Sequence, residues 1–151
     1  MPTAISQEKI DLSSENRTKD LANKFLKRLK VGDIIFLYGE MGVGKTTFIK
    51  YLINAFQKKN NLKLSEITSP TFNLLNEYQI NKIRINHYDL FRLKSVDEIK
   101  GLNLFDCNKN TISLIEWPQM IKEKPKDLIE LFFEYEKDHE KRSLQIKGLN
   151  L

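Results

Sequence analysis

Hydrophobic residues recur every three to four positions near the start of the chain, which predicts an amphipathic helix. Its apolar face consists of Leu21, Ala22, Phe25, Leu26 and Leu29. Asn16 or Thr18 is the expected N-cap, and Asp20 falls in the first turn, where a carboxylate stabilises the positive end of a helix. The first element is therefore expected to be a helix that buries one face.

An uninterrupted apolar run follows at Ile34–Tyr38. Such a run is typical of a strand that is buried on both faces. Residues 46–57 then predict a second helix. Its polar positions Lys50, Asn54 and Gln57 form one stripe, so the rest of its surface is expected to be buried.

Alternating or apolar runs predict further strands along the rest of the chain. The expected strands are residues 72–78, Ile83–Asp89, Thr111–Glu116, 129–135 and 143–147. A turn around Asn81 joins the first two, and Pro118 stops the third. A short helix is expected over residues 95–100, ending near Gly101.

This order of elements is typical of an α/β protein, with more strands than a purely parallel sheet would contain. We therefore predict one domain over residues 1–151, with a mixed parallel and antiparallel sheet flanked by helices. A composition of 40% hydrophobic and 30% charged residues agrees with a globular chain. The net charge of +5 leaves two interpretations open, which are solubility alone or a basic face toward RNA or an acidic partner.

The expected location is the cytoplasm. Cys107 is the single cysteine of the sequence, so an intrachain disulfide and a thiolate metal cluster are both excluded. The first eleven residues lack the basic and apolar segments of a secretory signal. The apolar run at Ile34–Tyr38 is far too short to span a bilayer, so no membrane association is expected.

Residues 39–46, with the sequence GEMGVGKT, fit the phosphate-binding pattern G-x-x-x-x-G-K-[ST] without a departure. An apolar strand precedes the pattern and an apolar-faced helix follows it, as the motif requires. The alternative, a glycine-rich turn with no ligand, is disfavoured by this context. The pattern predicts a P-loop NTPase domain that binds Mg·ATP.

Each residue type of this loop has a role in holding phosphate. The backbone N–H groups of Met41, Gly42, Val43 and Gly44 would line a concavity at the positive end of the following helix. Lys45, expected in a solvent-facing loop, would reach the β- and γ-phosphates. The Thr46 hydroxyl would take a Mg²⁺ coordination position.

Two strands are expected to end in a carboxylate that could serve the metal, at Asp89 and Glu116. The alternative for either acid is a helix cap or a surface charge. His87 could be a general base, although its spacing favours a core histidine. Trp117 could be a core or rim aromatic, or a wall beside the nucleotide.

The base is expected to be adenine. A guanine-specific protein should carry N-K-x-D, but residues 108–111 read NKNT and lack the aspartate. No D-x-x-G sequence occurs in the chain either. Both absences favour ATP over GTP.

In four blocks the sequence resembles the bacterial TsaE family, also called YjeE, which are small P-loop ATPases needed for threonylcarbamoyladenosine modification of tRNA. The blocks are residues 39–48, 69–72 with Glu77 and Tyr78, 87–93 and 116–118. Met41 stands where leucine is usual in the family, and Phe91 where tyrosine is usual. Neither departure removes a functional group of the predicted site.

The resemblance implies roles for particular residues. Thr46 and Glu116 correspond to the Mg²⁺ ligands, and Asp89 to a residue near the metal and the attacking water. Ser69, Pro70 and Thr71 resemble a switch-like loop that senses the γ-phosphate. The resemblance also implies nucleotide contacts for two residues at looser matches, which are Glu15 and Arg142.

By the same resemblance, the partners would be the proteins TsaD and TsaB, and ATP hydrolysis would reset their assembly between cycles. The tRNA would be involved only indirectly, and no DNA partner is implied.

Two alternative functions stay open at this stage. One is a small-molecule P-loop kinase, which usually carries an arginine-rich lid, and the other is a nucleotide-binding adaptor that does not hydrolyse ATP.

Overall fold

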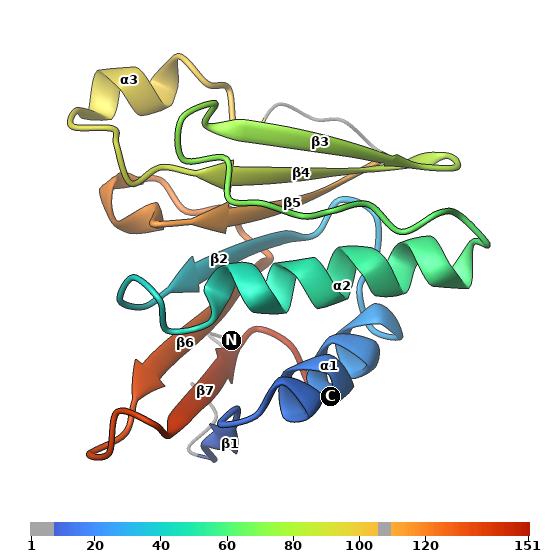
Figure 1. Ribbon diagram of the computed structural model, residues 1–151. Helices are drawn as coiled ribbons and strands as arrows, with labels where there is room; N and C mark the ends of the chain where they lie inside the picture. Colours follow the sequence, from blue (N-terminus) through green and yellow to red (C-terminus); the bar gives the residue numbers. More distant parts are fainter. Residues whose placement is uncertain (1–7, 106–109) are drawn as a thin grey trace.

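The computed structural model describes residues 8–105 and 110–151, and these form a seven-stranded sheet with helices packed on it (Figure 1). In chain order the elements are β1 (Ile10–Asp11), α1 (Glu15–Leu26), β2 (Ile34–Tyr38), α2 (Lys45–Lys59), β3 (Leu75–Ile80), β4 (Ile83–Asp89), α3 (Val96–Lys100), β5 (Thr111–Glu116), the 3₁₀ turn η1 (Pro118–Met120), β6 (Leu128–Tyr135) and β7 (Arg142–Lys147). The predicted α/β class with a mixed sheet is confirmed.

The strand order is β1-β7-β6-β2-β5-β4-β3. The four central strands β6, β2, β5 and β4 are parallel, while β3, β7 and β1 add antiparallel edges. In register, Leu37 of β2 pairs with Glu116, and Glu116 pairs with Asp89. The two acids of the sequence therefore meet at the carboxyl ends of neighbouring strands, where open α/β sheets bind ligands.

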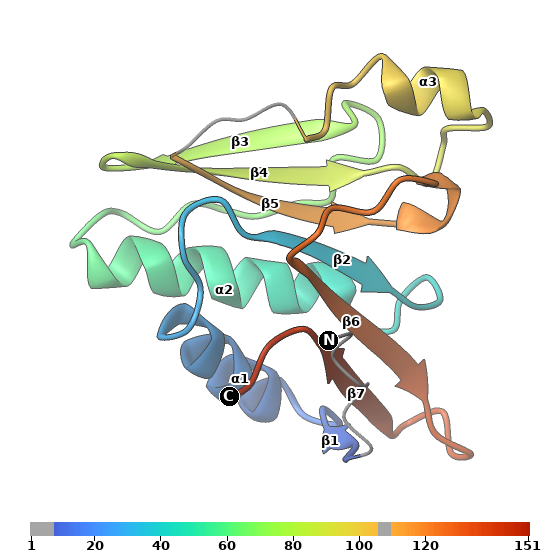
Figure 2. The same ribbon diagram turned by 180° about the vertical axis from the view of Figure 1, so that it is seen from behind.

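Helices α1 and α2 cover one face of the sheet (Figure 1). Phe25 of α1 and Phe48 of α2 meet edge to face, with ring centroids 5.2 Å apart, above the inward side chains of the strands. On the opposite face, seen from behind in Figure 2, a smaller cluster links the sheet to α3 and η1 through Phe36, Ile99 and Ile121. The central strand β2 is thus buried on both sides, which explains its uninterrupted apolar run.

Four details differ from the sequence predictions. The N-cap of α1 is Ser14, whose hydroxyl accepts the Arg17 N–H, and neither Asn16 nor Thr18 has this role. Because the helix starts earlier than expected, the acidic residue of its first turn is Glu15 and not Asp20. The short edge strand β1 was not predicted, because two residues carry no periodicity. Strand β3 begins at Leu75, three positions later than expected, since residues 71–73 form a turn.

The fourth difference concerns the polar stripe of α2. Gln57 is buried, and Ser65 satisfies its amide: the amide N–H donates to the Ser65 hydroxyl, and the amide oxygen accepts the Ser65 N–H. The stripe therefore ends before Gln57, and this residue ties α2 to the loop that follows it.

No helix within the described residues is both long and apolar enough to cross a membrane. Cys107, the first residues of the NKNT segment and residues 1–7 lie outside the described part of the chain.

Candidate functional site

The loop at residues 39–44 joins β2 to α2, and its backbone conformation requires glycine at two positions. Gly39 has a φ of +149°, and a Cβ there would lie 2.8 Å from the backbone oxygen of Phe133 on β6. Gly44 has a φ of +116° and is the N-cap residue of α2. The loop therefore turns tightly against the sheet and leads directly into the positive end of a helix of 15 residues.

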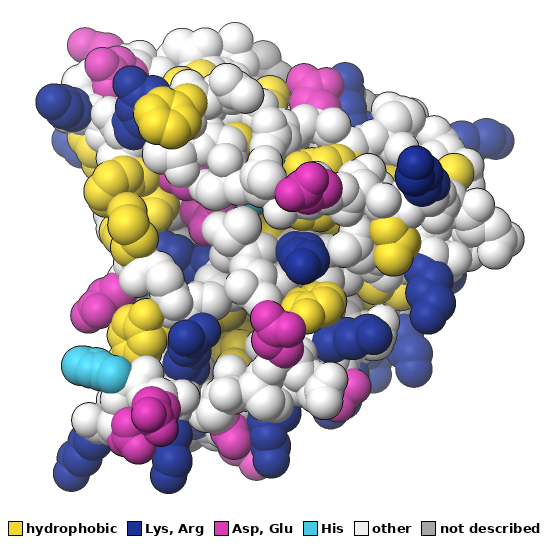
Figure 3. All heavy atoms as spheres, viewed as in Figure 1, with side chains coloured by type: hydrophobic (Ala, Val, Ile, Leu, Met, Phe, Trp, Pro, Cys, Tyr) yellow, Lys and Arg dark blue, Asp and Glu magenta, His cyan; other side chains and the backbone are white. Residues whose placement is uncertain are grey.

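A cavity of about 230 Å³ opens in front of this loop. Nine of the predicted site residues line it, and the rest of the lining is Thr47, Ser69 and Phe91. The nine are Met41, Gly42, Gly44, Lys45, Thr46, Thr71, Asp89, Glu116 and Trp117. In Figure 3 acidic and basic side chains lie within a hollow of this side of the molecule, and hydrophobic side chains gather along its outer edge. The structure thus brings the phosphate loop and both carboxylates to one place.

Lys45 is buried, with 4% of its surface exposed, and the expectation of a solvent-facing loop is wrong. It is the first residue of α2, and its Nζ donates to the Gly39 carbonyl oxygen. The same atom lies 3.6 Å from the centroid of the Trp117 ring. Burial lowers the pKa of Lys45, and the charges of Glu116 and Asp89 oppose that effect.

Glu116 lies at the centre of a buried hydrogen-bonded group. The Thr46 hydroxyl donates to its Oε1 at 3.0 Å, and Nε2 of His87 lies 2.6 Å from its Oε2. His87 is fully buried on the neighbouring strand, so the core position favoured by its spacing is correct. Its contact with Glu116 nevertheless fixes the orientation of a carboxylate that faces the cavity.

Asp89 binds the loop before β3. Its Oδ2 accepts hydrogen bonds from the hydroxyls of Ser69 at 2.7 Å and Thr71 at 3.0 Å. Its Oδ1 accepts the Phe91 N–H at 3.0 Å. The acid is therefore neither a helix cap nor a surface charge, and it connects the end of β4 to the segment that contains Thr71.

Glu15 and Arg142 lie away from this first cavity and line a second one, of about 220 Å³, on the other side of the loop. Val43, Gly44 and Thr47 also line it, so the two cavities share Gly44 and Thr47. Glu15 accepts a hydrogen bond from the Tyr51 hydroxyl at 3.0 Å, which raises the pKa of that hydroxyl. Together the two cavities form a path around the amino end of α2.

Two lining residues were not predicted individually: Thr47 and Phe91. Both lie inside the motif blocks, beside residues that were singled out.

The oxygen donors of the first cavity suit a hard divalent cation. Hydroxyl and carboxylate oxygens are the ligands that Mg²⁺ prefers, and it usually keeps waters and substrate phosphates as its other ligands. Within the described residues no three His, Cys, Asp or Glu side chains are grouped closely enough to hold a metal by themselves. The site therefore fits a cation that Thr46 and Glu116 share with phosphate.

The fold and the loop define an α/β protein in which a glycine-rich loop joins a central parallel strand to a helix. Residues 12–144 match the family model described as "Threonylcarbamoyl adenosine biosynthesis protein TsaE". The chain belongs to this TsaE family.

Relatives named tRNA threonylcarbamoyladenosine biosynthesis protein TsaE agree with this assignment. The chain is 42% identical to the one from Rickettsia prowazekii over 111 residues, which are 74% of each chain. It is 36% identical to that of Aquifex aeolicus over 81% of this chain and 84% of the relative. The crystal structure of Bacillus subtilis YdiB has the same fold, with a TM-score of 0.71, 22% identity, and coverage of 97% of this chain and 88% of that one.

Proposed function

We propose that this protein is a Mg²⁺-dependent ATPase that acts in tRNA threonylcarbamoyladenosine biosynthesis. It binds and hydrolyses ATP and thereby resets an assembly of the proteins TsaD and TsaB between cycles of adenosine modification. It does not itself act on the tRNA base. Family membership supports the pathway, and the site supports the nucleotide chemistry.

The observation that carries the proposal is the placement of four groups around one cavity. Lys45, Thr46, Glu116 and Asp89 all line the space in front of the glycine-rich loop. This set provides one cation, one hydroxyl and two carboxylates beside a helix N-terminus, which is the set that phosphoryl transfer requires. The adjoining cavity at Glu15 and Arg142 has room for the nucleoside end.

Different residues of the chain have different roles in ATP binding and hydrolysis. Backbone N–H groups of residues 41–44 and the ammonium of Lys45 bind the phosphates, so Lys45 gives up its bond to the Gly39 carbonyl. Thr46 and Glu116 would hold Mg²⁺, which would supply charge neutralisation for the phosphates. Asp89 orients the attacking water, and its hydrogen bonds to Ser69 and Thr71 connect the site to the switch-like loop.

Nucleotide binding can be followed through Trp117, which borders the cavity and touches Lys45. Adding MgADP or MgATP should change its intrinsic fluorescence, because the phosphates draw the Lys45 ammonium away from the ring. The change should be smaller in Glu116→Ala. Unchanged emission at a nucleotide concentration shown by calorimetry to saturate the protein would remove Trp117 from the site.

The function itself is tested by phosphate release from ATP with and without purified TsaD and TsaB. We expect phosphate release that requires Mg²⁺, is slow for the protein alone and is accelerated by the two partners. Phosphorylation of an added metabolite would instead identify a small-molecule kinase. Tight nucleotide binding without turnover, even with both partners, would identify an adaptor.

A further inference from the structure

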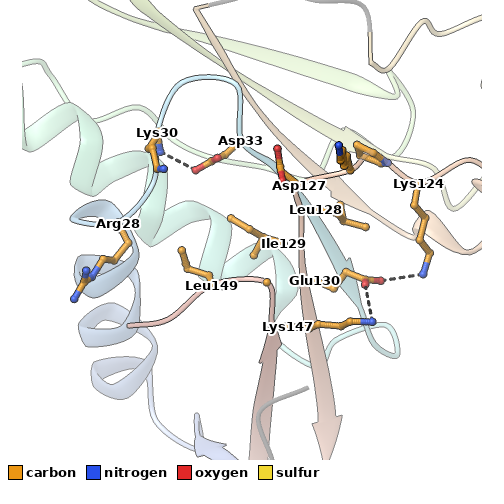
Figure 4. A pocket seen from close by; sticks show the side chains of 13 residues that line it. Arg28, Lys30, Asp33, Lys124, Asp127, Leu128, Ile129, Glu130, Lys147 and Leu149 are labelled. Atoms are coloured by element: carbon orange, nitrogen blue, oxygen red, sulfur yellow. Dashed lines mark hydrogen bonds and ion pairs between the residues drawn. The ribbon is translucent and has the colours of Figure 1, made fainter. Parts of the chain in front are cut away.

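A cavity of about 500 Å³ lies where β2 and β6 begin, at the edge of the sheet opposite the glycine-rich loop (Figure 4). Three segments form its wall: the connection from α1 to β2, the connection that precedes β6, and the end of β7. The five residues of β2 separate it from the loop by about 17 Å, at roughly 3.3 Å per residue. A ligand in this cavity would therefore not overlap a nucleotide.

The lining is mostly charged. Its cationic members are Arg28, Lys30, Lys124, Lys126 and Lys147, and its acidic members are Asp33, Asp127 and Glu130. Pockets for small molecules are lined mainly by apolar and aromatic side chains, but none of the 13 residues here is aromatic. An excess of positive charge without an aromatic platform suits an extended anion.

Glu130 organises one side of this cavity. Its carboxylate is 6% exposed and lies between two lysines in Figure 4, with Lys124 Nζ at 3.2 Å and Lys147 Nζ at 3.9 Å. The Tyr38 hydroxyl donates a third contact at 2.7 Å. The two ammonium groups of Lys124 and Lys147 thus share the single carboxylate of Glu130. The buried acid is fully paired, and the three groups together carry a net positive charge.

The other cations of the lining are free to bind. Arg28, Lys30 and Lys126 are exposed, and within residues 8–105 and 110–151 they form no ion pair. Arg28 and Lys30 lie in the connection between α1 and β2, and Lys126 lies in the connection that precedes β6, so these free charges come from two segments of the wall. Spaced charges of this kind match successive phosphates along a nucleic-acid backbone.

We propose that this cavity is a docking surface for the phosphodiester backbone of tRNA. The proposal goes beyond the ATPase activity and rests on membership of a tRNA-modification family. Protein interfaces centre on aromatic and apolar anchors, which this lining lacks, so an acidic protein is the weaker match. Because no ring is present for base stacking, the binding is independent of sequence and depends on salt.

The test uses two matched double variants of the full chain. Arg28→Glu with Lys126→Glu removes two unpaired cations of the cavity and leaves Glu130 with its lysines. Lys94→Glu with Lys100→Glu makes the same charge change on exposed lysines at α3. Fluorescence anisotropy measures binding of labelled tRNA to each variant from about 50 to about 200 mM salt.

The cavity variant should bind tRNA at least about tenfold more weakly than the α3 variant, and its salt slope should fall by about two, since each phosphate contact contributes roughly 0.9. Equal affinities and slopes for the two variants would overturn the proposal. The proposal would also be overturned if the cavity variant lost binding of polyglutamate but bound tRNA as well as the α3 variant does. MgADP titration through Trp117 should give the same affinity for both variants, which separates this test from that of the nucleotide site.

Discussion

At the scale of single residues, Lys45 has an unusual position for a cation. Its side chain is buried beneath Trp117, and burial lowers its pKa. The folded state therefore disfavours the charged form, and this cost is fully present at a pH below the lowered pKa. The cost disappears as the pH rises toward the ordinary lysine value of 10.5. The cation proposed to bind phosphate is thus maintained at the expense of stability.

Lys45→Ala should abolish hydrolysis, because the variant loses the cation that neutralises the β- and γ-phosphates. The fold should persist, since relief of the buried charge offsets the lost packing of the side-chain stem. We expect the free energy of unfolding to change by less than about 1 kcal/mol, the usual size of a mild substitution. Phosphate release and urea unfolding followed by circular dichroism measure the two effects.

Lys50→Ala, an exposed lysine on the same helix, is the matched control and should retain turnover. Near wild-type turnover in a folded Lys45→Ala variant would contradict the assignment of the loop.

The two carboxylates have different neighbours and should separate by role. Glu116 contacts the Thr46 hydroxyl, so Glu116→Ala should weaken Mg²⁺-dependent nucleotide binding by about tenfold, or about 1.4 kcal/mol. Asp89 contacts the hydroxyls of Ser69 and Thr71, so Asp89→Ala should mainly slow hydrolysis. Calorimetry with and without Mg²⁺, combined with turnover, distinguishes them. Equal loss of affinity in both variants would show that the division of roles is wrong.

At the scale of elements, the sequence predicted what a local pattern encodes. Strand β2 was found because burial on both faces gives a continuous apolar run, and α2 because its face is apolar. Strand β1 depends on pairing with β7, which is distant in the sequence, and no local period records that pairing. Strand β3 starts late because residues 71–73 form a turn within an otherwise strand-like segment. The Ser14 cap was missed because several polar residues precede α1 and only the folded backbone selects one of them.

The connection from β2 to α2 should tolerate no side chain at its first glycine. Gly39→Ala places a Cβ 2.8 Å from the Phe133 backbone oxygen, and that strand cannot move aside without disturbing the sheet. We expect a loss of about 2 kcal/mol or more in the free energy of unfolding.

Gly32→Ala is the control for this substitution, because Gly32 has a φ of +93° and no heavy atom within 4 Å of the added Cβ. It should cost about 1 kcal/mol from backbone strain alone. Urea unfolding compares the two variants, and equal losses would mean that the contact with β6 relaxes freely.

At the scale of the whole molecule, the candidate site is distributed over the chain but gathered at one edge of the sheet. The glycine-rich loop could be predicted because the sequence motif fixes its position. The two acids could be predicted because each stands at the end of a predicted strand. That Glu15 and Arg142 share a separate cavity could not be predicted, since it depends on how α1 and β7 pack beside the loop. The basic cavity at the opposite edge could not be predicted either, because its cations come from three segments that are distant in the sequence.

One consequence concerns the rate of hydrolysis. Efficient γ-phosphate transfer usually needs a positioned arginine, supplied in cis or in trans and worth about 10³–10⁵ in rate. None of the residues that line the first cavity is an arginine. Arg142 lies at the second cavity, and Arg92 is exposed, with its guanidinium 5.2 Å from the Phe72 ring. The isolated chain should therefore hydrolyse ATP slowly.

The assembly of TsaD and TsaB should accelerate hydrolysis, by supplying the missing charge or by ordering the loop that Asp89 holds. If the assembly prefers the ATP form, ATP must bind more tightly to the assembled protein by the same factor, because binding free energies around a closed cycle are reciprocal. Steady-state turnover is measured alone, with each partner and with both. The affinity of the protein for the assembly is compared in ADP and in a non-hydrolysable ATP analogue. The affinity of the protein for the analogue is compared with and without the assembly. Fast turnover by the isolated chain, unchanged by the partners, would leave a plain ATPase or a kinase and remove the resetting role.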